Sequence, residues 1–133
     1  MAPEFTALDL EGEAVTSVSL RGKPTVLVFW ASWCGPCRKE IPHLNELRQS
    51  YGDRINILGI NMGEPVPTAH RAAASLGMRY PSLVDPRSEL ATRYAVHSIP
   101  LVLILDETGR IRLRGNGLPR RPSVLIDGLL TDG

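Results

Sequence analysis

The sequence predicts a single mixed α/β domain over residues 1–133, and three observations support this prediction. The length is ordinary for one compact domain, and we find no linker or internal repeat that would divide the chain. Two continuous apolar runs, at 25–30 and 101–105, have the composition of strands buried on both faces. Segments with helical spacing alternate with such strands, which favours a central mixed sheet with helices on both faces.

An extra β-hairpin is predicted at the start of the chain. Two strand-like segments, 5–8 and 14–17, flank a turn-forming tetrapeptide at 9–12. The buried strand at 25–30 follows, and after a short turn a helix is predicted from Cys34 to about Ser50. The apolar face of this helix has amphipathic spacing and consists of Ile41, Leu44, Leu47 and Tyr51.

The rest of the chain continues the alternation of strands and helices. The predicted segments are, in order, a buried strand at 55–61, a helix at 67–76 ended by Gly77, a short edge strand or loop at 82–84, a helix at 88–94 with Ser88 as its N-cap, strands at 101–105 and 110–114, and a final helix at 123–130. A turn-rich tetrapeptide joins the last two strands, so they are predicted to be antiparallel.

The composition argues against several classes of protein. The chain is 43% hydrophobic and 22% charged, as in ordinary globular domains. A net charge of +1 without a basic run gives no support for nucleic-acid binding. No apolar stretch predicts a transmembrane helix, and Met1–Phe5 lacks the pattern of a signal peptide. Because residue 1 lies almost against the first strand, we expect an extracytoplasmic protein whose export or anchor segment has been removed. A cytoplasmic protein is the alternative.

The two cysteines, Cys34 and Cys37, lie where a strand is predicted to end and a helix to begin. Residues three apart on a helix meet the separation of about 4.4–6.8 Å that a disulfide requires between Cα atoms. A loop this small adds little stability, because loop-closure entropy grows with loop length. The spacing therefore favours a chemical role for the pair over a structural one.

The helix N-terminus makes the two cysteines unequal. Free N–H groups and the helix dipole favour a thiolate at Cys34, whose pKa is predicted to fall below about 8.5. We expect Cys34 to be the accessible nucleophile that attacks a disulfide, and Cys37 to resolve the mixed disulfide. Pro36 suits the first helical turn because it lacks an N–H group, and Gly35 leaves room for a substrate backbone. Trp33 is predicted to be a flat apolar contact surface.

Metal binding is the other use that two nearby cysteines suggest. Structural zinc needs four ligands, and the three histidines are scattered without paired ligand spacing, so zinc is disfavoured. Two thiolates could hold Cu(I), which leaves a Cu(I)-binding or copper-site assembly module as the alternative function. No Met-rich or His-rich tract supports it. We expect no cofactor beyond a redox-active Cys34–Cys37 disulfide.

The string FWASWCGPC at 29–37 resembles the active site of the thioredoxin superfamily, which implies the thioredoxin fold. Pro42 matches the proline that kinks the first active-site helix, and Ile99-Pro100 matches the cis-proline beside the disulfide. The resemblance implies that the backbone of Ile99 pairs with a bound substrate strand. An ordinary trans proline at the start of a strand is the alternative. The Gly-Pro pair between the cysteines is thioredoxin's own, which favours a reduction potential near about −270 mV.

A finer resemblance covers nearly the whole chain. The opening 3–24 and the helix sequence CRKEIP at 37–42 are similar to the TlpA/ResA-like branch of extracytoplasmic reductases, which includes cytochrome c maturation proteins. The resemblance implies a reductase of protein disulfides, with apocytochrome c or a copper-site protein as substrate and an upstream dithiol as electron donor. We expect a monomer, because the fold needs no partner for its core. The opening also resembles peroxiredoxins. Those enzymes use threonine three residues before the reactive cysteine, where this chain has Ala31, so a thiol peroxidase is less favoured.

Glu40 is the expected proton-handling group. Plain thioredoxin carries a buried aspartate on the strand before the motif, and the matching residue here is Val28. At about 100° per residue, Glu40 lies about 60° from Cys37 around the helix, where members of the branch have a glutamate. A partly buried carboxylate there would have a raised pKa and could relay the proton of the resolving thiol. A solvated charge, paired with a helix arginine, is the alternative. Glu64 matches a second glutamate of the branch near the site.

Overall fold

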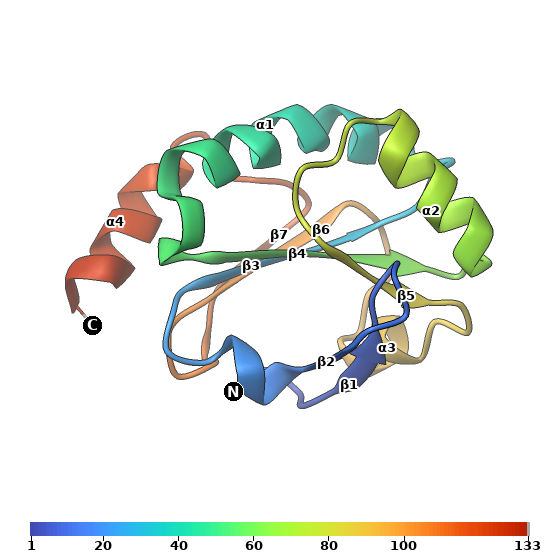
Figure 1. Cartoon of the computed structure of the whole chain (residues 1–133). Coiled ribbons are helices and arrows are strands. Elements are labelled where there is room, and N and C mark those ends of the chain that lie inside the picture. Colours follow the sequence, from blue (N-terminus) through green and yellow to red (C-terminus); the bar gives the residue numbers. More distant parts are fainter. Residues whose placement is uncertain (133) are drawn as a thin grey trace.

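A five-stranded mixed sheet forms the centre of the molecule in a computed structural model that describes residues 1–132 (Figure 1). Gly133, the last residue of the predicted domain, lies outside the described residues. The strand order is β5-β4-β3-β6-β7, with β3, β4 and β5 parallel and β6 and β7 antiparallel to their neighbours. The strands are β3 Thr25–Trp30, β4 Asn56–Met62, β5 Ser82–Asp85, β6 Leu101–Leu105 and β7 Ile111–Gly115. The predicted mixed sheet is confirmed.

The predicted N-terminal hairpin forms a separate two-stranded sheet from β1 (Thr6–Leu8) and β2 (Ala14–Thr16). The carboxylate of Asp9 holds the hairpin turn by accepting the N–H groups of Glu11 and Glu13. A single bridge between Asp9 and Leu83 joins the hairpin to the edge strand β5. A short 3₁₀ helix at Ser17–Leu20 then leads towards β3.

Helices cover both faces of the sheet, as predicted (Figure 1). α1 (Gly35–Tyr51), α2 (Val66–Ser75) and α4 (Pro122–Asp132) lie on one face, and the short α3 (Glu89–Arg93) lies on the other with the hairpin. Pro42 lies inside α1, at the place the resemblance gives to a helix-kinking proline. Among residues 1–132, no helix is both long and apolar enough to cross a membrane.

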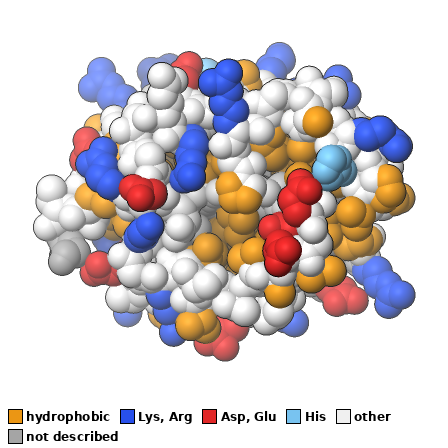
Figure 2. All heavy atoms as spheres, viewed as in Figure 1, with side chains coloured by type: hydrophobic (Ala, Val, Ile, Leu, Met, Phe, Trp, Pro, Cys, Tyr) orange, Lys and Arg blue, Asp and Glu red, His pale blue; other side chains and the backbone are white. Residues whose placement is uncertain are grey.

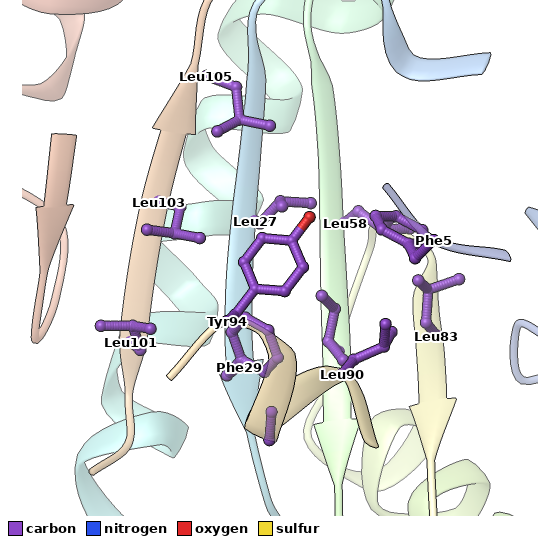
Figure 3. Packing of buried hydrophobic residues seen from close by; sticks show 12 residues of the cluster. Phe5, Leu27, Phe29, Leu58, Leu83, Leu90, Tyr94, Leu101, Leu103 and Leu105 are labelled. Carbon is purple, nitrogen blue, oxygen red and sulfur yellow. The ribbon is translucent and has the colours of Figure 1, made fainter. Parts of the chain in front are cut away.

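The alternation of side chains along the strands builds a core on each side of the sheet. On β3, Val26 and Val28 pack towards α1 and α4, whereas Leu27 and Phe29 point to the opposite side. Figure 3 shows this second cluster, in which the rings of Phe29 and Tyr94 lie 5.7 Å apart. Trp30, the last residue of β3, belongs to a third cluster together with both cysteines. The sheet thus places an apolar floor directly at the start of α1.

Glycine is required where β3, β4 and β5 meet. Trp30 Nε1 donates to Ser82 Oγ at 2.9 Å across β4. A Cβ at Gly59, which lies between them, would approach Ser82 Oγ to 2.9 Å and Trp30 Nε1 to 3.0 Å. A side chain at residue 59 would therefore displace the indole that lies beneath the active-site segment.

The N-cap position predicted for the third helix is confirmed, but the serine does not supply the capping hydrogen bonds. Ser88 lies at the cap position, but its backbone is left-handed (φ 57°) and its side chain caps no N–H group. Instead Asp85, at the end of β5, accepts the N–H groups of Leu90 at 3.1 Å and Ala91 at 3.0 Å. The left-handed turn at Ser88 brings the start of the helix back onto Asp85, so the acid replaces the serine.

Candidate active site

Cys34 lies at the junction between β3 and α1, where it is the N-cap of the helix. Its backbone is extended (φ −88°, ψ 107°), and its sulfur accepts the N–H group of Cys37 at 3.2 Å. Pro36 follows within the first turn, where a missing N–H group costs no hydrogen bond. The sulfur of Cys34 therefore lies at the positive end of the α1 dipole.

Cys34 and Cys37 form a disulfide with their Cα atoms 5.2 Å apart. The two residues are only 4% and 2% exposed, so the prediction that Cys34 is the accessible member does not hold in this disulfide form. Neighbouring residues supply the exposed part of the site. Gly35 and Pro36 lie at the surface, and Trp33 is 70% exposed. The indole of Trp33 is thus available as the contact surface that the sequence predicts.

The loop before β6 covers the sulfur of Cys34. The carbonyl oxygen of Ile99 lies 3.7 Å from Cys34 Sγ, and the peptide bond between Ile99 and Pro100 is cis. Ile99 is half-buried and packs against the cluster that contains both cysteines, while Pro100 is buried. The structure therefore brings Ile99, with Pro100 next to it, to the disulfide from 65 residues further along the chain, as the resemblance implies.

An apolar floor lies beneath the disulfide. Trp30 and Ala73 are buried there, and half-buried side chains from the hairpin, α2 and the loop after α2 surround them. These half-buried residues are Leu10, Ala72, Leu76 and Met78. Water is thus kept away from the inner side of Cys37.

Glu40 is half-buried on α1, one turn beyond Cys37, as predicted. Its Oε1 accepts the N–H group of Leu118 at 3.3 Å, and a Cβ at Gly117 would approach this oxygen to 2.5 Å. Its Oε2 is buried and has no hydrogen-bond partner among the described residues. Burial, together with the negative charge of Glu40, raises the pKa of Tyr80. The proton-relay role of Glu40 stays a prediction.

The expected helix arginines serve other acceptors. Arg48 donates to the carbonyl of Gly52 at the end of α1, and Arg38 donates to the carbonyl of Ser32 through Nε at 3.1 Å and Nη2 at 2.8 Å. Neither arginine therefore pairs with Glu40 in the structure. Arg38 holds the turn before Cys34 instead.

Glu64 lies on the other side of the same turn. This carboxylate is only 8% exposed and accepts the N–H of Ser32 at 2.7 Å, the hydroxyl of Ser32, and Nδ2 of Asn61 at 2.9 Å. Burial acts to raise the pKa of Glu64, but the hydrogen bonds from Ser32 and Asn61 outweigh it and hold the pKa below its ordinary value. Sequence reasoning noticed Glu64 but missed Ser32 and Asn61. A polar residue ending an apolar strand was the available signal for Asn61.

A groove of about 640 Å³ lies between α1 and the segment that leads into α4. Glu40 and His43 line it from α1, and Asp127 lines it from α4. Neither cysteine lines this groove.

On the face seen in Figure 2, basic and acidic side chains are spread around hydrophobic ones and do not form one charged patch. Within residues 1–132, no three or more His, Cys, Asp or Glu side chains converge as a metal site would require.

Comparisons with known proteins agree with this geometry. A family model described as the AhpC/TSA family matches residues 1–114. The thiol-disulfide oxidoreductase ResA of Geobacillus thermodenitrificans is 34% identical over 112 residues, which cover 84% of this chain and 64% of that relative. The chain thus spans less than two thirds of this relative's length.

Solved structures extend the comparison to nearly the whole chain. The solution structure of a Bacteroides thetaiotaomicron protein superposes with a TM-score of 0.87 at 32% identity, covering 97% of this chain and 85% of that one. A secreted disulfide oxidoreductase of Mycobacterium tuberculosis, described as homologous to E. coli DsbE, superposes with a TM-score of 0.79 at 25% identity, covering 97% and 96%. The predicted thioredoxin fold is confirmed by these likenesses.

Proposed function

The chain belongs to the AhpC/TSA family, and from this premise we propose that it is a thiol–disulfide oxidoreductase that reduces protein disulfides. One observation carries the proposal: the Cys34–Cys37 disulfide begins α1 and faces the carbonyl of Ile99, 3.7 Å from Cys34 Sγ. The name of the ResA relative supports the same chemistry. We propose no cofactor beyond the disulfide itself.

The reaction begins from the dithiol form. The thiolate of Cys34 attacks one sulfur of the substrate disulfide, which breaks that bond, forms a mixed disulfide and releases one substrate thiolate. The N–H of Cys37 and the α1 dipole favour this thiolate, because both place positive charge at Cys34 Sγ.

Cys37 completes the reaction. Its thiol loses a proton and attacks Cys34 Sγ, which restores the Cys34–Cys37 disulfide and releases the second substrate thiolate. Two electrons pass from the protein to the substrate, and an upstream dithiol returns them. Glu40 is the proposed acceptor of the Cys37 proton, since it lies one turn further along α1 and its Oε2 has no partner among the described residues.

The proposed substrate surface surrounds Cys34. The backbone of Ile99, beside the cis Pro100, pairs with an extended substrate segment, so main-chain hydrogen bonds supply most of the grip. The exposed indole of Trp33 packs against apolar substrate side chains, and exposed Gly35 and Pro36 let the segment approach the sulfur. Such a site takes a disulfide-containing protein with little dependence on its side chains.

The proposed setting is extracytoplasmic, in line with the secreted relative of Mycobacterium tuberculosis. There, a monomeric reductase would act on the oxidised cysteines of apocytochrome c or of a copper-site protein. Both substrates are proposals from the family resemblance.

Reduction of insulin disulfides by dithiothreitol, with this protein as catalyst, tests the proposal. We expect Cys34→Ser to abolish catalysis and Cys37→Ser to accumulate a mixed disulfide with the substrate. Activity retained by Cys34→Ser would contradict the mechanism. The reduction potential tests the direction: we expect a value near about −270 mV, whereas one near about −120 mV would mean that the protein makes disulfides.

A further inference from the structure

We propose that Glu64 and Arg38 are positioning residues that clamp Ser32 from two sides and thereby hold Cys34 at the N-terminus of α1. The inference rests on the proposed function, because it assigns these residues to the setting of its nucleophile. It also separates Glu64 from proton transfer.

The contacts of Ser32 carry the inference. Its N–H and hydroxyl groups donate to the carboxylate of Glu64, and its carbonyl accepts two N–H groups of Arg38. Every polar group of Ser32 is thus bonded to one of these two side chains. Since Glu64 precedes α2 and Arg38 belongs to α1, two separate elements fix a single residue of the turn.

The turn has little else to hold it in place. Within it, the N–H of Cys34 donates to the carbonyl of Ala31 at 3.2 Å, and the N–H of Arg38 donates to the carbonyl of Cys34 at 3.2 Å. Ser32 lies two residues before Cys34, so a rotation of its backbone changes the direction in which Cys34 enters the helix. A clamp on Ser32 therefore acts on the N-cap geometry of the nucleophile.

The end of β4 determines the position of Glu64. Asn61 pairs with Trp30 in the parallel register of β4 and β3, so both strands end side by side. Gly63 follows with a φ of +73°, and this left-handed turn places Glu64 against Ser32, which follows β3. Nδ2 of Asn61 also donates to Glu64 Oε1 at 2.9 Å, which fixes the position of the carboxylate.

The bonding of Glu64 suits a clamp better than a proton carrier. Oε1 accepts two N–H groups and Oε2 accepts a hydroxyl group, so protonation would break a bond to Ser32. These donors hold the pKa of Glu64 below its ordinary value against the effect of burial. Glu64 therefore stays ionised while the cysteines react.

A pair of substitutions at residue 64 separates the clamp from the charge. Glu64→Gln and Glu64→Ala remove the same negative charge, but glutamine can still accept the N–H of Ser32 and donate to its hydroxyl. Asp106→Ala is the matched control, because Asp106 accepts the N–H and hydroxyl of Thr108 and the N–H of Arg110 in a turn at the opposite end of the sheet.

Two readouts are measured on the reduced protein: the rate of insulin-disulfide reduction, and the pH midpoint of Cys34 alkylation by iodoacetamide. We expect Glu64→Ala to reduce disulfides about tenfold more slowly than Glu64→Gln, with an alkylation midpoint about half a pH unit higher. Asp106→Ala should match the wild type in both. If Glu64→Ala and Glu64→Gln agree in both readouts, the clamp is refuted.

Arg38 provides a second test, since it is exposed and its loss should not prevent folding. Arg38→Ala is expected to raise the alkylation midpoint, whereas Lys39→Ala, which removes the same charge one residue further, is expected to leave it unchanged. The effects of Arg38→Ala and Glu64→Ala should not add, because both act through Ser32. Equal effects of Arg38→Ala and Lys39→Ala, or full additivity, would overturn the proposal.

The alkylation readout uses no disulfide substrate. If the wild-type protein reduces no disulfide, the proposed function fails, yet the midpoints of the Glu64 and Arg38 variants still decide whether the clamp exists.

Discussion

Gly117→Ala tests the role of Glu40 without changing the acid itself. A Cβ at residue 117 would lie 2.5 Å from Glu40 Oε1, which is closer than real Cβ contacts come, and 3.6 Å from its carboxyl carbon, which is an ordinary contact. The carboxylate is the free end of a flexible side chain, so it can swing away while the backbone stays in place. In doing so it gives up the N–H of Leu118, which donates to it at 3.3 Å.

The stability change and the activity change should therefore differ in size. The lost hydrogen bond is a long one at a half-buried site, which corresponds to about 1 kcal/mol in the free energy of unfolding. A displaced proton acceptor costs more in rate, since general-base groups contribute about a hundredfold or more and the shifted carboxylate keeps only part of that. We expect Gly117→Ala to slow the release of the second substrate thiol by about tenfold.

The assay is the single-turnover decay of a mixed disulfide between Cys34 and a labelled peptide, with stability measured separately by chemical denaturation. Gly115→Ala is the matched control, because a Cβ there would meet its nearest neighbour, the Gly117 carbonyl, at an ordinary 3.6 Å. Glu40→Gln should be at least as slow as Gly117→Ala. Decay at the wild-type rate in Gly117→Ala, together with a slow Glu40→Gln, would refute the reasoning that the position of the carboxylate matters.

Two further predictions concern the other structural acids. Asp85→Ala should lower the free energy of unfolding by about 1–2 kcal/mol, because it removes the side chain that caps α3, while Ser88→Ala should change it little. Equal losses of unfolding free energy in urea titrations of the two variants would contradict this capping scheme. Because the folded pKa of Glu64 lies below its ordinary value of 4.5, its carboxylate contributes stability that is present above that pH and lost as the pH falls through the folded pKa. The stability difference between wild type and Glu64→Gln, measured by urea titration from pH 7 to pH 3, should therefore shrink in acid, and a constant difference would count against it.

Local patterns predicted the elements that depend on local burial. The apolar run of β3 and the amphipathic spacing of α1 gave their positions to within a residue or two, because each pattern reports directly which faces are buried. The side chain that caps α3 could not be predicted from the sequence, because the backbone geometry at Ser88 decides which acceptor the N–H groups meet. Ser88 is a common N-cap residue at the N-cap position, but its backbone is left-handed, and Asp85 accepts the helix N–H groups instead.

In the candidate site too, the sequence predicted the local features but not the contacts between residues far apart in the chain. The spacing of Cys34 and Cys37 is a local signal, and the disulfide follows from it directly. The contact of Ile99 with Cys34 joins residues far apart in the chain, and only the family resemblance could suggest it. Ser32 carried no signal at all, since its partner Glu64 reaches it only through the pairing of β3 with β4.

The two glutamates near the disulfide show why sequence position alone could not assign their roles. Both are glutamates near the start of α1, and the sequence resemblance singles out both of them. Their hydrogen-bond partners differ: Glu64 has a donor on each oxygen, whereas Glu40 has one long bond on Oε1 and a buried Oε2 with no partner among the described residues. The three hydrogen bonds that Glu64 accepts from Ser32 and Asn61 favour its ionised form and suit a positioning role. Glu40 keeps an oxygen that is buried and has no partner among the described residues, and that makes it the stronger candidate for accepting the proton of Cys37.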